Sequence, residues 1–191
     1  MYNKFLKSYS PDGAMNLEQL TSCAPGIVEF QNHFGGMSFR GGLYRVVRPA
    51  EEIVWKQRIL IAYPEFEARI TCFAFDWMGN AFATDSQRLV DGQAGVVMLE
   101  TGTGKALNIP SNLESFHDVG LNQYGEAALA IKFYETWTSA GGVRPDYAHC
   151  VGYKRPLFLG GEDTVGNLEM SDIDVYWHLL GQLIRKARGL A

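Results

Sequence analysis

The sequence predicts an α+β fold, in which an antiparallel sheet with short helices is followed by a smaller, helix-rich C-terminal domain packed against it. Two successive hairpin patterns predict the sheet, and helical periodicity after Pro110 predicts the second part. The 191 residues are 47% hydrophobic and 13% aromatic, which suits one or two small domains with a substantial core. We expect an N-terminal domain over residues 1–110 and a C-terminal domain over residues 111–191.

The first part of the chain predicts short helices and one strand. Residues 16–22 suit a short helix, and in "PGIVEFQNHFGG" Pro25 and Gly35 mark the beginning and the end of another. "GGLYRVV" predicts a strand after a glycine turn. "PAEEIVW" places Glu51 and Glu52 in the first turn of a helix, where the helix dipole favours negative charge.

From Arg58 onward the pattern predicts strands. "RILIAY" is a continuous apolar run, and we expect it to form a strand. "ARITCFAFDWMGNAFATD" predicts a hairpin that turns at "MGN", and "AGVVMLETGTGKALNI" predicts a second hairpin. Its turn, "TGTGKA", is not a phosphate-binding loop, because Leu99 and Ala106 replace the first glycine and the final Ser or Thr of that motif.

The rest of the chain is mainly helical in pattern. "SNLESF" has the spacing of a capping box with Ser111 as the cap. We expect one long helix over "NQYGEAALAIKFYETWTSAGG", ending at Gly141, and then a strand and a turn in "YAHCVGYKRPLFLGG". The last helix is expected to begin with a second capping box, formed by Ser171 and Asp174. Its predicted buried stripe consists of Ile173, Trp177, Leu180 and Ile184.

Charge and composition exclude several classes of function. The formal net charge of -4 argues against direct binding of nucleic acid, because phosphate contacts need clustered Lys and Arg, but it leaves a basic protein partner open. No apolar stretch approaches the roughly 18 residues of a membrane span, and no secretory signal pattern is present. Cys23, Cys72 and Cys150 form no CxxC pair, which predicts reduced thiols in a cytoplasmic protein.

No residue pattern predicts a cofactor or a metal. The four histidines form no HxH or HxxxH pair, and "GGED" and "DID" lack the spacing of a calcium loop. The last part of the chain nevertheless carries an acidic run without Lys or Arg. Asp172 and Asp174 are explained as acids in a first helical turn. The other three members, which have no such explanation, are Glu162, Asp163 and Glu169.

The stretch "YKRPLFLGGEDTVGNLEMSDIDVYWHLLGQLI" resembles the C-terminal domain of bacterial immunity proteins encoded beside type VI secretion DNase toxins. The shared features are the "G-Y-K-x-P-L" strand, the "L-G-G-E-D" turn, the "N-L-E" link and the "D-x-D-V-Y-W" helix start. "GLYRVVRPAEEIVW" and "CFAFDWMGNAFATD" are similar to the GAD-like domain of the same proteins, whose C-terminal domains also resemble SUKH-type immunity sheets. The motif residues here are Gly160, Gly161, Glu162, Asp163, Asp172, Asp174 and Trp177.

The resemblance implies a cytoplasmic, non-enzymatic protein that binds a cognate DNase toxin and occludes its active site, which protects the producing cell. The GAD-like domain is expected to reach the toxin's catalytic face. A nuclease groove is electropositive because it holds a polyanion, so an acidic inhibitor gains fast capture. We therefore expect the partner-binding residues to include Glu18, Glu29, Glu51 and Glu52.

Two other functions are compatible with the residues. The first is a small hydrolase or lyase that uses an Asp/Glu pair as acid and base in a pocket between the domains. The second is an autoregulatory DNA-binding protein with a local basic face. The basic residues that cluster in the sequence are Arg40, Arg45, Arg48, Lys56 and Arg58.

Overall fold

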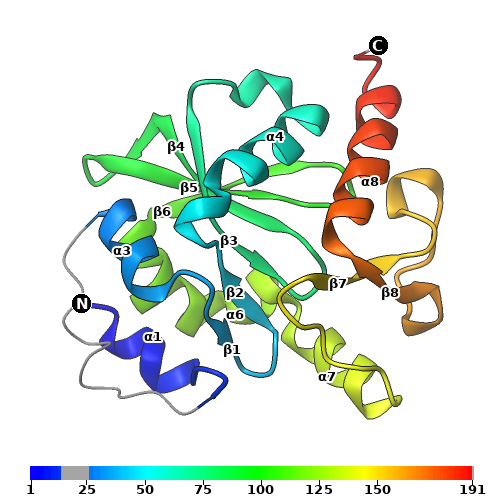
Figure 1. Ribbon diagram of the computed structural model, residues 1–191, viewed down its shortest axis with the longest axis horizontal. Helices are drawn as coiled ribbons and strands as arrows, with labels where there is room; N and C mark the ends of the chain where they lie inside the picture. Colours follow the sequence, from blue (N-terminus) through cyan, green and yellow to red (C-terminus); the bar gives the residue numbers. More distant parts are fainter. Residues whose placement is uncertain (14–25, 191) are drawn as a thin grey trace.

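The computed structural model of the chain describes residues 1–13 and 26–190. A six-stranded antiparallel sheet with the order β1-β2-β3-β4-β5-β6 forms its centre (Figure 1). Phe75 of β3 pairs with Ala81 of β4, and Leu99 of β5 pairs with Ala106 of β6, so both predicted hairpins are confirmed. The strands are β1 (Ser38–Phe39), β2 (Tyr44–Val46), β3 (Ile70–Asp76), β4 (Ala81–Val90), β5 (Gln93–Leu99) and β6 (Ala106–Asn112).

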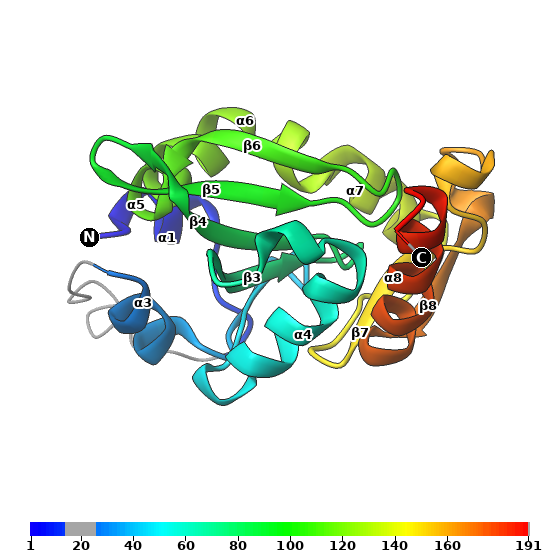
Figure 2. The same ribbon diagram turned by 90° about the horizontal axis from the view of Figure 1, so that it is seen from above.

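The two faces of the sheet carry separate cores, and a β-bulge between Cys72 and Ala74 in β3 turns Phe73 and Phe75 to opposite faces. One face contributes Phe73 and Phe82 to an aromatic core with α1, α3 and α6. The other face contributes Phe75 and Val97 to a core with α4 and α8. Helices α4 and α6 accordingly lie on opposite sides of the sheet (Figure 2). The helices are α1 (Asn3–Ser8), α3 (Ile27–Phe34), α4 (Glu52–Ala62), α6 (Leu121–Leu129) and α8 (Ile173–Ala187).

A second, two-stranded sheet joins the C-terminal region to the central one. Strand β7 (His149–Tyr153) pairs with β8 (Leu168–Asp172). The backbone N–H of Val151 donates to the carbonyl of Trp77 at 2.7 Å, which ties this sheet to the first hairpin. The α+β prediction with a helix-rich C-terminal region is therefore confirmed. The division at residue 110 stays a prediction, and β6 runs across that position.

The helix predicted from "PGIVEFQNHFGG" is α3, and the strand in "GGLYRVV" is β2. "PAEEIVW" begins a helix as predicted, through a 3-10 turn, η1 (Pro49–Glu51), that leads into α4. The helix predicted over residues 16–22 lies outside the described part of the chain. No helix among the described residues has the length and apolar character needed to cross a bilayer.

The strand predicted in "RILIAY" is wrong, because that run completes α4. An apolar run of this length fits a buried strand or a buried helix equally well. The spacing of Trp55, Ile59 and Ala62 decides the outcome, since all three are buried on one face of α4 against the sheet and α8.

The long helix predicted after "SNLESF" is also wrong, because it divides into α6 and α7 (Ile131–Ser139) at Ala130. Ala130 takes the left-handed conformation, with φ 47° and ψ 52°. The carbonyl of the preceding residue, Leu129, accepts a hydrogen bond from the indole N–H of Trp77 at 2.9 Å. A tertiary contact thus fixes the point where the local helical pattern is interrupted.

Both predicted capping boxes are displaced by one residue. Asn112, not Ser111, caps the short helix α5 (Leu113–Ser115), in a reciprocal box with Ser115. Asp172, not Ser171, caps α8, because β8 runs through Ser171 and ends at Asp172, so the helix begins one residue later. The stripe predicted for this last helix is buried as expected.

Candidate protein-interaction site

Helices α4 and α8 pack against each other, and residues near their N-terminal ends bring together carboxylates from the two parts of the chain (Figures 1 and 2). They enclose a polar pocket of about 120 Å³, which we call the junction pocket. Its floor includes Trp55, which is buried and stacked on Phe75 with 4.6 Å between ring centroids. The polar side chains that line the pocket are Arg48, Glu51, Arg58, Tyr147, Asp172 and Asp174.

Hydrogen bonds hold the N-terminal side of the junction pocket in place. Glu51 ends η1 and accepts a hydrogen bond from the Tyr147 hydroxyl at 2.7 Å and another from Arg48 at 3.2 Å. The guanidinium of Arg48 also lies 3.8 Å from the centroid of the Tyr147 ring. Burial, and then the hydrogen bond to Glu51, raise the pKa of Tyr147 well above its usual value. Tyr147 therefore keeps its proton and acts as a donor to the carboxylate.

The C-terminal side of the pocket is built by the start of α8. Asp172 caps the helix by accepting hydrogen bonds from the backbone N–H groups of Asp174 and Val175 at 2.9 and 3.0 Å. Arg58 crosses from α4 and donates from Nε to Asp174 at 2.8 Å. This ion pair connects the two helices at the mouth of the pocket.

The ion pairs leave an acidic excess around the pocket. Arg48 and Arg58 neutralise Glu51 and Asp174 respectively. Glu52 and Asp172 take part in none of the ion pairs between described residues. Carboxylates near the N-termini of helices are stabilised without a cation, so the pair remains available to a basic group of a partner.

An apolar groove of about 470 Å³ continues from the junction pocket between α4 and α8. Arg58 and Asp174 line both cavities. The two helices approach closely at Gly181, where an added Cβ would lie 3.0 Å from a methyl group of Ile61. The apolar residues that line this α4–α8 groove are Val54, Ile61, Val175 and Leu179.

The structure brings only some of the predicted partner-binding residues together. Glu51 lines the junction pocket, and Glu52 begins the neighbouring helix. Glu29 is exposed in the first turn of α3 and is not part of the pocket lining. Glu18 lies outside the described residues. A partner role for these four residues stays a prediction.

Of the remaining members of the acidic run, Asp163 has a side-chain partner. The Tyr153 hydroxyl donates to Asp163 at 2.5 Å. The side-chain amide of Asn167 donates to the carbonyls of Arg155 and Glu162, at 2.9 and 2.8 Å, and so closes the loop between β7 and β8. Glu169 is exposed in β8, opposite Gly152.

The two glycines of the "LGGED" turn are required by backbone geometry. Gly160 has a φ of +78°, in the left-handed region that favours glycine. A Cβ at Gly161 would lie 1.9 Å from the carbonyl oxygen of Arg155. Trp177 is likewise structural: it is fully buried, and its indole N–H donates to the carbonyl of Gly79 at 2.9 Å.

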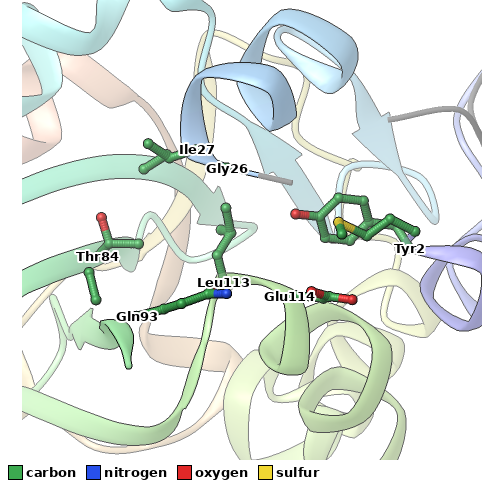
Figure 3. A pocket seen from close by; sticks show the side chains of 9 residues that line it. Tyr2, Gly26, Ile27, Thr84, Gln93, Leu113 and Glu114 are labelled. Atoms are coloured by element: carbon green, nitrogen blue, oxygen red, sulfur yellow. The ribbon is translucent and has the colours of Figure 1, made fainter. Parts of the chain in front are cut away.

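Two other places in the described part of the chain bear on the acid/base alternative. A small pocket of about 140 Å³ beside Tyr2, Ile27 and Leu113 contains a single carboxylate, Glu114 (Figure 3). Burial raises the pKa of the Asp76 carboxyl to about 7. That group is buried and already accepts hydrogen bonds from the backbone of two residues and one amide side chain.

The basic residues that cluster in the sequence do not form a basic face. Arg45 is fully buried. Arg48 and Arg58 are paired with carboxylates, and Arg40 lies 3.9 Å from Glu135. These pairs remove most of the positive charge that a DNA phosphate would meet.

Two cysteines and one histidine of the described residues are explained by packing. Cys72 and Cys150 are buried free thiols, and burial raises the pKa of Cys150 to about 12. His117 is buried between the Tyr44 hydroxyl and the Leu113 carbonyl, at 2.8 and 2.7 Å, and burial lowers its pKa to about 4. Within residues 1–13 and 26–190, no three His, Cys, Asp or Glu side chains gather in a way that could hold a metal ion.

Sequence reasoning missed the apolar part of the site. The sequence of α4 could have indicated an exposed apolar face. When the segment is read as a helix, Ile53 and Val54 fall on the face opposite Trp55 and Ile59. Reading "RILIAY" as a strand hid the face that α4 shares with α8.

Comparison with known proteins supports the resemblance. Residues 111–184 match the family model described as T6SS immunity protein Tdi1, C-terminal. The matched region contains Asp172, Asp174 and Trp177, and the match supports a type VI secretion immunity protein.

A solved structure shares the fold. The crystal structure of Atu4351 from Agrobacterium tumefaciens is similar with a TM-score of 0.62 and 15% sequence identity, over 95% of this chain and 89% of that one. At this identity the likeness concerns the fold alone. No curated protein sequence matches the chain.

Proposed function

We propose that this chain is an immunity protein that binds the nuclease domain of a cognate DNase toxin in the cytoplasm and blocks its active site without chemistry of its own. The family match to residues 111–184 supports the immunity role. The observation that carries the proposal of a basic partner is the set of acidic side chains at the junction pocket. Three carboxylates and two arginines line this pocket, Glu52 follows Glu51 at the start of α4, and an apolar groove adjoins the pocket.

Charge and shape have separate roles in this proposal. The DNA groove of a nuclease is electropositive, so the carboxylates of the junction pocket attract it over a distance of about one Debye length, roughly 8–10 Å. Such steering raises association rates by about 10- to 1,000-fold. The α4–α8 groove and the exposed face of α3, which carries Glu29, then supply short-range fit. Occupation of the groove in which DNA lies is sufficient to inhibit the nuclease.

The first experiment measures association with the toxin's nuclease domain, taken from the neighbouring reading frame and inactivated at its catalytic residues. Glu52→Lys is the test variant, because Glu52 takes part in no ion pair between described residues and its reversal therefore disturbs little else. We expect association at low salt to slow by about tenfold or more and to depend less on salt. Glu67→Lys, an exposed change of the same charge near the other end of α4, is the matched control.

The outcomes separate the two parts of the proposal. Equal association rates for Glu52→Lys, Glu67→Lys and the unchanged protein would remove the assignment to the junction pocket while leaving toxin binding intact. If the unchanged protein forms no complex with the nuclease domain, or forms one that still cleaves DNA when the nuclease is active, the proposed function itself is wrong.

A further inference from the structure

The outward face of α8 carries a row of exposed aliphatic side chains. Val175, Leu179 and Leu183 recur every fourth residue and are 55%, 57% and 38% exposed. Ile53 and Val54 of the adjacent α4 are 71% and 40% exposed. Single exposed apolar residues are ordinary on protein surfaces, but a contiguous group on two packed helices is typical of a contact surface.

The charges of α8 are arranged so that the helix complements an antiparallel copy of itself. Its N-terminal end carries Asp172 and Asp174, and its last turn carries Arg185 and Lys186. If a two-fold axis passes through Leu179, each residue faces the one at an equal distance on the other side of position 179. Leu179 then meets its own copy, Val175 meets Leu183, and Asp172 meets Lys186.

The residues between these pairs also tolerate such a contact. Gln182 and His178 lie on the same face, with 2.8 Å between the Gln182 amide nitrogen and the His178 Nε2. Neither brings a fixed like charge to the axis. The α4–α8 groove, lined by Val54 and Leu179, provides a depression for an aliphatic side chain of the second copy.

We propose that the chain forms a homodimer in which the α8 helices of two copies pack antiparallel about a two-fold axis at Leu179. The contact is isologous, so each copy contributes the same surface. Asp172, which makes no ion pair between described residues, gains Lys186 of the second copy as its partner at both ends of the interface. This inference goes beyond the proposed function. The homodimer covers Asp172 and the α4–α8 groove, so a toxin that binds there displaces the second copy.

The test is sedimentation velocity on the full chain over a wide range of concentration. We expect the unchanged protein to approach twice the mass of one chain, and Leu179→Asp to remain monomeric. Leu89→Asp is the matched control and should still dimerise. Leu89 is 66% exposed in β4, and the β4–β5 hairpin points away from α8 (Figures 1 and 2). Circular dichroism melts of each variant establish that it is folded.

Two further variants test the geometry. Lys186→Glu should raise the dissociation constant on the order of tenfold, because two opposite-charge contacts become repulsive. Leu179→Cys, with Cys23 replaced by Ser, should form an intermolecular disulfide under mild oxidation, whereas Leu89→Cys in the same background should not. Cys72 and Cys150 are buried and do not interfere.

Several outcomes would overturn the proposal. A monomer at every concentration contradicts it, as does a dimer that persists in Leu179→Asp. If the unchanged protein is monomeric and Leu179→Asp instead weakens binding to the nuclease domain, the toxin covers this face and the homodimer is excluded. Failure of toxin binding leaves the sedimentation result unchanged, so the two proposals are tested separately.

Discussion

Replacing Arg45 should destabilise the protein more than any exposed change, because this residue joins the two parts of the chain from inside. Arg45 is fully buried in β2. Its guanidinium donates to the main-chain carbonyls of Asp76, Asp146 and His149. It also lies 4.4 Å from the centroid of the Phe75 ring. Burial lowers its pKa only to about 10, so the group stays charged at neutral pH and is an electrostatic partner of Asp76.

We expect Arg45→Met to lower the free energy of unfolding by about 3–5 kcal/mol, the usual cost of removing one member of a buried charge pair. Met fills much of the volume, so the cavity term is small. Each lost hydrogen bond from a charged donor costs about 1.5–3 kcal/mol, and relief from burying the guanidinium offsets part of the sum. Arg45→Lys keeps the charge but has fewer hydrogen-bond donors. Its free energy of unfolding should lie between those of Arg45→Met and the unchanged protein.

The assay is urea unfolding followed by tryptophan fluorescence, since the chain has four tryptophans. A double-mutant cycle with Asp76→Asn, measured at a pH above the raised pKa of the Asp76 carboxyl, isolates the charge coupling. We expect the double variant to be more stable than the sum of the single losses predicts, by at least about 1 kcal/mol. A loss below about 1 kcal/mol for Arg45→Met, or strict additivity in the cycle, would refute the argument that a buried charge pair joins these segments.

Three other predictions concern the core and the motif. Because the pKa of Asp76 is raised to about 7, this group contributes stability that is fully present below about pH 3.8 and is lost as the pH rises through 7. The pKa of His117 is lowered to about 4, so its contribution is present above pH 6.5 and is lost on acidification. Asp76→Asn removes only the first contribution. On going from pH 7 to pH 4, the free energy of unfolding of this variant should therefore fall by on the order of 3 kcal/mol more than that of the unchanged protein. Parallel pH profiles of the two proteins would contradict this. Gly161→Ala should lower the free energy of unfolding by roughly 2–3 kcal/mol, because the added Cβ clashes with a backbone carbonyl. Gly160→Ala should lower it by about 1 kcal/mol. Equal denaturation midpoints for the two variants would contradict this difference. Trp177→Phe should lose about 1–3 kcal/mol, because the Gly79 carbonyl loses its donor, and an unchanged melting temperature would count against it.

Local patterns were enough wherever neighbouring residues decide the structure. The turns at "MGN" and "TGTGKA" lie between strands that pair directly with each other, so both hairpins could be predicted from short windows. The buried stripe of α8 was equally readable, because one helix face meets one core. The acids of the helix starts were placed near the correct ends, and the capping residues were missed by one position because β8 extends to Asp172.

Other features depend on contacts between distant segments, and no local window contains them. "RILIAY" becomes part of α4 because Trp55 and Ile59 pack on Phe75 and Trp177. The helix breaks at Ala130, next to Leu129, whose backbone carbonyl accepts a hydrogen bond from the indole N–H of Trp77. Arg45 looked like part of a basic cluster and is instead an internal donor.

The sequence by itself determined the class of fold, the hairpins, the acidic character of two helix starts and the family resemblance of the C-terminal region. Only the tertiary structure placed Glu51 beside Asp172 and Asp174 and set an apolar groove next to them. The physical reason is that hairpins and helix starts are decided by residues within a few positions of each other. A surface shared by α4 and α8 arises only when helices more than a hundred residues apart bury their opposite faces in one core.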